Sequence, residues 1–406
     1  MITVAEARTL IFRGAAPGPI ESTSLLRALG KVLAEPVLAP CCLPLCDHSG
    51  VEGYAVRSRD LVAAEPDRPV RLVMRRDAGR ANGTSKAVPE LESGSAWHVL
   101  AGDPLPLGAD AVVRADEAFE DGADVCLGRP VAAGENVRGS GADVREGDRL
   151  LDAGTVLTPA CIALLAGVGQ LDVKVHAAPR VAILAAADGR TPSGHLPRPG
   201  QLYDSSAFAL AAMVSEAGGI PILLGGLGDD REQALLQLRE AATHDVILAS
   251  AGGAWAGADF LAEMLSRHGE IHVDRVAHLP GKPFTYATLW GKPVFALPAP
   301  ADATLVTFEV YVRPLLRLMT GQRELERPRL WVTMAEAVAK PPGKEAYLRV
   351  TLDRTSDGAI AHLAGSPESA QLSGLARANG LVIVPAEASG LAAGEKVEAL
   401  ALAALN

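Results

Sequence analysis

The stretch that most constrains the fold of this chain is residues 245–259, which read DVILASAGGAWAGAD. An unbroken apolar run at 246–248 is typical of a strand buried on both faces, and a helical pattern follows after three glycines. These glycines are Gly252, Gly253 and Gly257. Glycine lets the backbone come close to a ligand, and free N–H groups at a helix start favour an anion. The sequence therefore predicts a strand, a glycine turn and a helix, in which the turn is either an anion site or a plain connection.

Two carboxylates, Asp245 and Asp259, bracket this turn. In an open parallel sheet such a turn lies at the carboxyl edge, where ligands bind. Carboxylates next to an anion site usually need a divalent cation between them. We therefore expect Asp245 and Asp259 to bind Mg²⁺ beside a phosphorylated or oxyanionic ligand.

Length and charge limit the class of protein. A chain of 406 residues suggests about two to four domains, and 49% apolar with 21% charged residues is typical of globular proteins. A formal net charge of −10 disfavours nucleic acid and anionic membranes as partners. No apolar run approaches the ~18–20 residues of a membrane span and no signal-peptide pattern is present, so we expect a cytoplasmic protein. The five cysteines have no zinc spacing, and we expect them to be small buried residues.

The N-terminal part contains two helical patterns and one polar run. Thr3 and Glu6 form a capping box before a short helix, and apolar residues at helical spacing predict a second helix across 25–33. The run at 46–57, CDHSGVEGYAVR, places charged and hydroxyl side chains around two glycines. We interpret it either as a functional loop or as a solvated turn.

The next segment predicts β structure inserted into a helical domain. Short strands are expected at 70–74, 96–100, 111–113 and 124–127, between turn residues. Thr158 then caps a helix that shares the character of the N-terminal ones. We therefore expect a discontinuous helical domain made of residues 1–26 and 148–178, with a β-rich domain at 27–147 between the two parts.

From residue 179 the pattern alternates between strands and helices. Strands are expected at 181–185, 220–224, 245–250, 271–276 and 293–297, and helices near 205–217, 229–243, 259–268 and 304–319. This alternation predicts a doubly wound parallel α/β domain at 179–326. Strands at 347–352, 360–363, 380–384 and 396–402 predict a small β-barrel domain at 327–406. The expected fold class is multidomain α/β plus β.

Short motifs occur in a fixed order through nearly the whole chain. They are DHSGVEGYA at 47–55, GDPLP at 102–106, GADAVV at 108–113, GENVR at 134–138, GAD at 141–143, GD at 147–148, GQLYD at 200–204, the stretch 245–259, PGKP at 280–283, LP at 297–298, QLS at 371–373 and ANGLV at 378–382. In this order they resemble the molybdopterin molybdenumtransferases, a family that includes the E domain of gephyrin. The chain is identified as a divergent member of that family.

The resemblance implies a function and partners. It implies insertion of molybdate into adenylylated molybdopterin, with Mg²⁺, by an elongated homodimer of four-domain subunits. It also implies contact with the preceding adenylyltransferase or with recipient molybdoenzymes.

The resemblance further implies roles for individual residues. It places catalytic carboxylates at Glu52, Asp143, Asp245 and Asp259, the last two as metal ligands. It places molybdopterin and phosphate contacts at Ser49, Asp188, Ser250, Gly252, Gly253, Gly257 and Pro298. It places molybdate contacts at Lys282, Pro283, Arg349 and Ser373.

The chain departs from the family pattern where chemistry is expected. Glu52 stands where the family has aspartate, and the family's SGGVSVG loop is AGGAWAG at 251–257, which loses two hydroxyls and gains Trp255. The family's LPGNPVS is LPAPADA at 297–303. Trp255 either stacks on the pterin or adenine ring or fills the space of the ligand. Two functional hypotheses follow: a divergent molybdenumtransferase, or a non-catalytic binding or scaffold paralogue with a degenerate site. A third is an unrelated nucleotide-binding protein.

Overall fold

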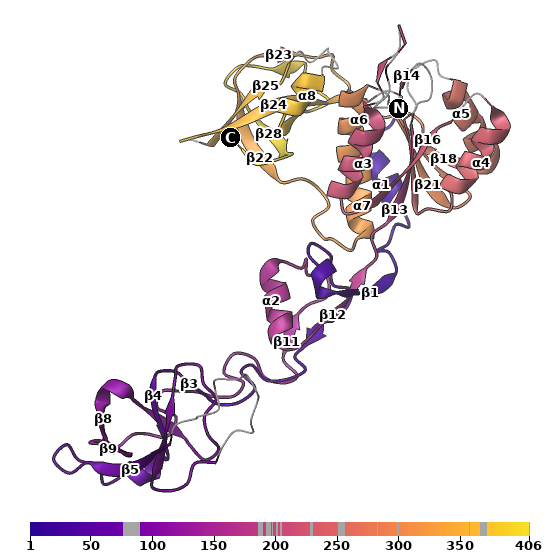
Figure 1. Cartoon of the computed structure of the whole chain (residues 1–406). Coiled ribbons are helices and arrows are strands. Elements are labelled where there is room, and N and C mark those ends of the chain that lie inside the picture. Colours follow the sequence, from indigo (N-terminus) through magenta and orange to yellow (C-terminus); the bar gives the residue numbers. More distant parts are fainter. Residues whose placement is uncertain are drawn as a thin grey trace.

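The molecule is elongated, with a β domain at one end and two packed domains at the other (Figure 1). The computed structural model describes residues 1–75, 90–185, 190–191, 196, 198–199, 202–203, 205–227, 230–250, 256–281, 283–298, 300–356, 358–365 and 372–405, without the side chains of 185, 190, 202 and 256–259. In the described part of the chain, no helix has the length and apolar character needed to cross a membrane.

The distal β domain contains all four strands expected between residues 70 and 127. Its six-stranded sheet has the order β7-β4-β6-β5-β9-β8, in which β5 and β6 run parallel and the other neighbours antiparallel. Buried side chains from these strands, such as Leu72, Val113 and Leu127, form its core. The elements are β3 (His48–Ser49), β4 (Gly53–Val56), η2 (Ser58–Leu61), β5 (Val70–Arg75), β6 (Ser95–Val99), β7 (Ala111–Arg114), η4 (Ala115–Glu117), β8 (Ala118–Asp121), β9 (Asp124–Leu127) and β10 (Val137–Arg138).

The middle region holds one helix and two short pairs of strands. Thr158 caps α2 as expected, because its hydroxyl accepts a hydrogen bond from Cys161 N. The elements are β1 (Ile20–Ser24) with β12 (Asp172–His176), β2 (Val37–Leu38) with β11 (Arg149–Leu151), η1 (Leu25–Arg27) and α2 (Pro159–Gly167).

The helix expected across 25–33 is wrong. Only the three residues of η1 are helical, and Gly30 then turns the chain with φ 75°. Val32 and Leu33 form β-bridges with residues of the returning segment. Because Leu26 is 97% exposed, the helical spacing of the leucines does not correspond to a buried face.

The N-terminal helix α1 (Val4–Phe12) packs on the α/β domain. Its expected capping box is present, with Glu6 N donating to the Thr3 hydroxyl and Thr3 N donating to the Glu6 carboxylate. The buried face of α1 shares one core cluster with Val181 and Leu315. A bridge between Ile2 and Val276 fixes the chain before the helix. Thus α1 and α2 do not belong to one helical core, and the boundaries at 26, 147, 178 and 326 stay predictions.

The α/β domain has helices on both faces of a six-stranded sheet, as expected for a doubly wound fold (Figure 1). Alternate residues of β13 and β17 enter two different cores. One core contains α1, α3, α6 and α7, and the other contains α4 and α5. The bounds are β13 (Arg180–Ala185), β14 (Arg190–Thr191), β15 (Leu202–Tyr203), α3 (Ser206–Glu216), β16 (Ile220–Gly226), α4 (Arg231–Ala241), β17 (Val246–Ser250), α5 (Ala256–His268), β18 (Gly269–Val273), β20 (Thr285–Leu289), β21 (Lys292–Leu297), α6 (Ala301–Thr307), the π-helical turn η5 (Phe308–Val312) and α7 (Arg313–Met319).

One edge of this sheet differs from the expected parallel arrangement. The sheet order is β16-β13-β17-β21-β20-β18, and its first four strands are parallel. Strand β20, which the sequence pattern does not predict, pairs antiparallel with both β21 and β18. The short turn between β20 and β21 forces this direction, because a parallel connection needs a longer crossover.

The C-terminal domain is a closed five-stranded barrel, as expected. The strands follow the cycle β24-β25-β22-β28-β26 and return to β24. A short strand from the α/β domain, β19 (His278–Leu279), joins β24 in parallel and ties the two domains together. The other elements are β22 (Arg329–Met334), β23 (Val338–Ala339), β24 (Glu345–Thr355), β25 (Gly358–Leu363), α8 (Leu372–Arg377), β26 (Gly380–Val384), β27 (Gly390–Leu391) and β28 (Lys396–Ala401).

Candidate active site

Strand β17 ends in Ser250, at the carboxyl edge of the parallel part of the sheet. Its side chain is buried, and its Oγ has no hydrogen-bond partner among the described residues. A buried hydroxyl without a partner costs about 1–3 kcal/mol, so this position suits a polar ligand atom. Ser250 also pairs with Leu297 of β21, which leads into α6.

The glycine turn itself lies outside the described residues, and with it Gly252, Gly253 and Trp255. Helix α5 begins at Ala256, so Gly257 and Asp259 belong to its first turns. Gly257 is therefore a helical residue and is not part of the turn. The side chain of Asp259 is not described.

Asp245 lies at the opposite end of β17 from the turn. It precedes Val246, and its carboxylate accepts a hydrogen bond of 2.8 Å from the backbone N–H of Arg180. A strand rises ~3.3 Å per residue, so five strand residues place Asp245 roughly 16 Å from the turn. The structure corrects the expectation that Asp245 and Asp259 flank one Mg²⁺ ion, because a ligand must lie within about 2.1 Å of that ion.

Two other residues expected to contact the ligand, Asp188 and Lys282, also lie outside the described residues. Among the residues whose side chains are described, no three His, Cys, Asp or Glu side chains gather in a way that could hold a metal ion.

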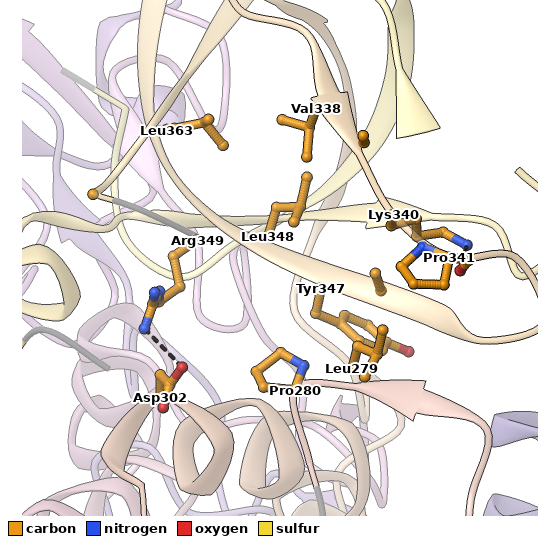
Figure 2. Close-up of a pocket in the computed structure, with 13 residues that line it drawn as sticks. Leu279, Pro280, Asp302, Val338, Lys340, Pro341, Tyr347, Leu348, Arg349 and Leu363 are labelled. Atoms are coloured by element: carbon orange, nitrogen blue, oxygen red, sulfur yellow. Dashed lines mark hydrogen bonds and ion pairs between the residues drawn. The ribbon is translucent and has the colours of Figure 1, made fainter. Parts of the chain in front are cut away.

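A pocket of about 240 Å³ lies between the α/β domain and the barrel (Figure 2). Its walls come from the end of β19 and the residue after it, the start of α6, the strands β23, β24 and β25, and the loop after β23. This volume is below the ~300–1,000 Å³ of sites that enclose a drug-sized ligand. It suits a small anion or one end of a larger ligand. The lining residues are Leu279, Pro280, Asp302, Val338, Ala339, Lys340, Pro341, Ala346, Tyr347, Leu348, Arg349, Leu363 and Gly365.

Arg349 of β24 points into this pocket and meets Asp302 of α6 (Figure 2). Arg349 Nη1 lies 3.0 Å from Asp302 Oδ2, and the two side chains are 6% and 10% exposed. The other carboxylate oxygen, Oδ1, has no hydrogen-bond partner among the described residues. Removing one partner of a buried ion pair costs about 3–5 kcal/mol, because the remaining charge is left uncompensated. The pocket therefore holds a guanidinium whose charge is matched within the chain.

The other polar side chains of the pocket are engaged with their own surroundings. Lys340 Nζ donates to the carbonyl oxygens of Lys344 at 2.8 Å and Ala386 at 3.3 Å. The Tyr347 hydroxyl donates to the Glu345 carboxylate. Burial and the nearby charge of Glu345 raise the pKa of Tyr347, so its hydroxyl stays protonated at neutral pH.

Three further expected ligand residues lie in the same part of the molecule. Pro298 is buried, and its carbonyl accepts a hydrogen bond of 2.5 Å from the Thr304 hydroxyl in α6. Pro283 is exposed and follows the pocket residue Pro280 along the chain. Ser373 is exposed on α8, which contacts α6. The structure thus places Ser250, Pro298 and Arg349 near the end of β17 and the start of α6, and Ser373 on a helix that contacts α6.

The remaining expected residues, Ser49, Glu52 and Asp143, belong to the part of the chain before α2, outside the two domains that form this pocket. Ser49 is buried, and its hydroxyl donates to Val51 O at 2.5 Å, which makes it a turn residue. Glu52 is 61% exposed, and its Oε1 lies 3.9 Å from His98 Nε2. Asp143 is exposed in the segment that returns from the distal domain. One chain alone does not bring these side chains to Arg349.

Sequence reasoning missed Asp302 as a site residue. The signal is present in the departures from the family pattern, since LPAPADA at 297–303 places Asp302 where LPGNPVS has valine. The contact with Arg349 depends on a barrel strand 47 positions later in the chain, which the sequence pattern does not place against α6.

Comparison with known proteins gives matches along the whole chain. Three family models match: the MoeA N-terminal region (domain I and II) at 2–169, a probable molybdopterin binding domain at 182–318, and the MoeA C-terminal region (domain IV) at 332–402. Molybdopterin molybdenumtransferase 2 of Mycobacterium tuberculosis is 35% identical and covers 92% of this chain and 93% of its own length. Molybdopterin molybdenumtransferase of Synechococcus elongatus is 32% identical over 95% of both chains.

Solved structures of related proteins also match the whole chain. A molybdopterin biosynthesis MoeA protein from Pyrococcus horikosii has a TM-score of 0.84 and 29% identity, with 100% of both chains covered. The molybdopterin-binding model between the two MoeA regions, together with this fold, defines a multidomain protein of molybdenum cofactor biosynthesis. The chain belongs to the molybdopterin molybdenumtransferase family, which is a family of enzymes.

Proposed function

We propose that this protein inserts molybdate into molybdopterin that is delivered as an adenylylated intermediate. The observation that carries the proposal is the similarity to named molybdopterin molybdenumtransferases over more than nine-tenths of both chains. The pocket around Arg349 supports it, because a guanidinium is a suitable group for an oxyanion and the pocket has the size of an oxyanion subsite.

Each part of the proposed site has a physical task. Arg349 holds molybdate through charge-assisted hydrogen bonds, together with Lys282, Pro283 and Ser373. The buried Ser250 hydroxyl donates to the phosphate part of the adenylylated pterin, whose pterin end extends outside the pocket. Asp188, Gly252, Gly253, Gly257 and Pro298 complete the binding surface by resemblance.

We further propose that the working form is a homodimer. Glu52 precedes β4 in the distal domain and Asp143 lies between β10 and β11, whereas Arg349 belongs to β24 of the barrel, at the other end of the molecule (Figure 1). In a twofold-symmetric dimer, the distal domain of one copy can reach the pocket of the other, and two identical sites result. This arrangement would bring Glu52 and Asp143 of one copy to the ligand bound by the other.

Magnesium and the cellular setting belong to the same proposal. Mg²⁺ neutralises phosphate charge when bound, and Asp259 is the candidate ligand that remains after Asp245 is set aside. We place the protein in the cytoplasm, where it takes its substrate from the preceding adenylyltransferase and delivers cofactor to molybdoenzymes.

A second candidate is a non-catalytic molybdopterin-binding or scaffold paralogue. The observation that favours it is the Asp302–Arg349 ion pair, since the carboxylate occupies the guanidinium expected to bind molybdate. The loop at 251–257 lacks two hydroxyl side chains of the family pattern, which also favours a paralogue without catalytic activity.

A turnover assay tests the proposal. Purified protein is mixed with adenylylated molybdopterin and molybdate, with and without Mg²⁺, and released AMP is measured by chromatography. We expect AMP release that depends on molybdate and on Mg²⁺. Arg349→Met should lower kcat/KM for molybdate about tenfold to a hundredfold, because about one charge-assisted contact is lost.

The matched control is Arg354→Met, which removes an exposed arginine from the same strand and should retain activity. Binding of the pterin without molybdate-dependent AMP release would instead support the scaffold paralogue.

A further inference from the structure

Asp302 carries a charge that the structure of helix α6 does not require. The residue before α6, Pro300, makes no side-chain capping hydrogen bond, and Asp302 lies in the first turn. A first-turn aspartate normally interacts with the helix dipole from an exposed position. The Asp302 side chain is only 10% exposed, and it is directed at Arg349 of another domain (Figure 2).

The Asp302 carboxylate resembles a bound oxyanion in its contact with Arg349. One of its oxygens, Oδ2, lies 3.0 Å from Nη1 of the planar guanidinium, and the other, Oδ1, has no hydrogen-bond partner among the described residues. Carboxylates and tetrahedral oxyanions use the same fork of N–H donors on arginine. An external oxyanion at Arg349 must therefore compete with a carboxylate that is covalently part of the chain.

The apolar lining of the pocket strengthens the ion pair with which an external oxyanion must compete. The pocket is lined mainly by apolar side chains, in which the attraction between opposite charges is greater than in water. Lys340, the other described cation of the pocket wall, already donates to backbone carbonyls. Asp302 Oδ1 has no hydrogen-bond partner among the described residues, so the carboxylate is held mainly by its charge contact with Arg349.

We propose that Asp302 is a built-in competitor that sets the oxyanion affinity of the Arg349 pocket. It replaces the valine of the family pattern and holds the guanidinium when no oxyanion is bound. A tetrahedral oxyanion enters by displacing this carboxylate. The identification of the oxyanion as molybdate rests on the proposed function, whereas the competition itself does not.

Calorimetry of the full-length protein with sodium molybdate tests this proposal, with sodium sulfate as a second oxyanion at matched ionic strength. Asp302→Asn keeps the shape of the side chain and removes its charge, and Asp302→Val restores the family residue. We expect both variants to bind molybdate at least about tenfold more tightly than the wild type. Molybdate should also raise the melting temperature of both variants more than that of the wild type.

Two controls locate the effect. Asp302→Asn combined with Arg349→Met should lose the gain, because the guanidinium is then absent. Asp230→Asn removes the carboxylate that caps α4 and should leave molybdate affinity unchanged. Folded Asp302→Asn and Asp302→Val proteins that bind molybdate no better than the wild type would overturn the proposal.

The turnover assay separates this inference from the proposed function. If the wild type releases AMP with molybdate and Asp302→Asn shows no tighter binding, the competitor proposal fails and the enzyme assignment stands. If Asp302→Asn binds oxyanions more tightly but neither protein turns over, the competitor proposal stands and the enzyme assignment fails.

Discussion

At the scale of single residues, part of the motif at 47–55 is required by packing and not by chemistry. A Cβ on Gly53 would lie 1.9 Å from the carbonyl oxygen of Val113 in the neighbouring strand β7. Packing also requires glycine at Gly281 of the PGKP motif, because a Cβ there would lie 1.7 Å from the His278 ring. A motif match therefore mixes residues that shape the backbone with residues that meet a ligand.

Gly53→Ala tests the packing role. The added methyl group collides with backbone, which cannot move without disturbing the sheet, so we expect a loss of about 1–3 kcal/mol in the stability of the distal domain. Urea unfolding followed by circular dichroism measures it. Gly139→Ala is the matched control, because the nearest atom to its Cβ is Asp47 Oδ1 at 3.8 Å. Equal stability of the two variants would contradict the packing role.

The sequence identifies Arg349 by resemblance, but it does not show that this residue forms an ion pair. The sequence gives the identity of the side chain. Its contact with Asp302 arises only because the barrel packs against α6. The Ser49 hydroxyl is used locally, because it donates to the carbonyl oxygen of Val51 two positions along the chain.

At the scale of elements, the segment 301–319 links two charged regions of the molecule. It carries Asp302 in the first turn of α6, Glu309 in η5 and Arg313 at the start of α7. Arg327 donates to both Glu216 of α3 and Glu309 of η5, at 2.7–3.0 Å. This network fixes the chain between the α/β domain and the barrel.

The network predicts a pH dependence of stability. Hydrogen bonds from Arg327 hold the pKa of Glu216 below its ordinary value of 4.5 in the folded protein. The unfolded chain then binds more protons, so this stabilisation is present at neutral pH and is lost as pH falls from about 4.5 through the lower folded pKa. We expect Glu216→Gln to lower the melting temperature at pH 7, with a difference from the wild type that shrinks below pH ~4.5.

Glu240→Gln, at an exposed position of α4, serves as the control for this series. A difference between Glu216→Gln and the wild type that stays constant from pH 7 to pH 3 would contradict the linkage. Differential scanning fluorimetry at each pH gives the measurement.

The elements themselves were predictable where one periodicity dominates. The buried run before Ser250 and the helix patterns near 205–217 and 304–319 have direct counterparts in β17, α3 and α6 to α7. The pattern failed at 25–33, because β-bridges to distant strands outweigh helical spacing there. It missed β20, because an antiparallel hairpin inside an α/β domain breaks the alternation of strands and helices.

At the scale of the whole molecule, the expected fold class is confirmed, but the spatial relation of the site residues was not predictable. The order of motifs along the chain does not give the distances between them. The elongated shape separates β4, which Glu52 precedes, from β24, which contains Arg349 (Figure 1). The proposed function places Glu52 and Arg349 in one site, which requires two copies of the chain.

Mixed dimers test this central claim most directly. One chain carries Glu52→Gln and the other Arg349→Met, the two are co-expressed with different affinity tags, and the dimers that carry both tags are isolated. Each such dimer has one site with both native residues, so we predict about half of the wild-type rate of molybdate-dependent AMP release. A rate no higher than that of either variant alone would contradict a site shared between two copies.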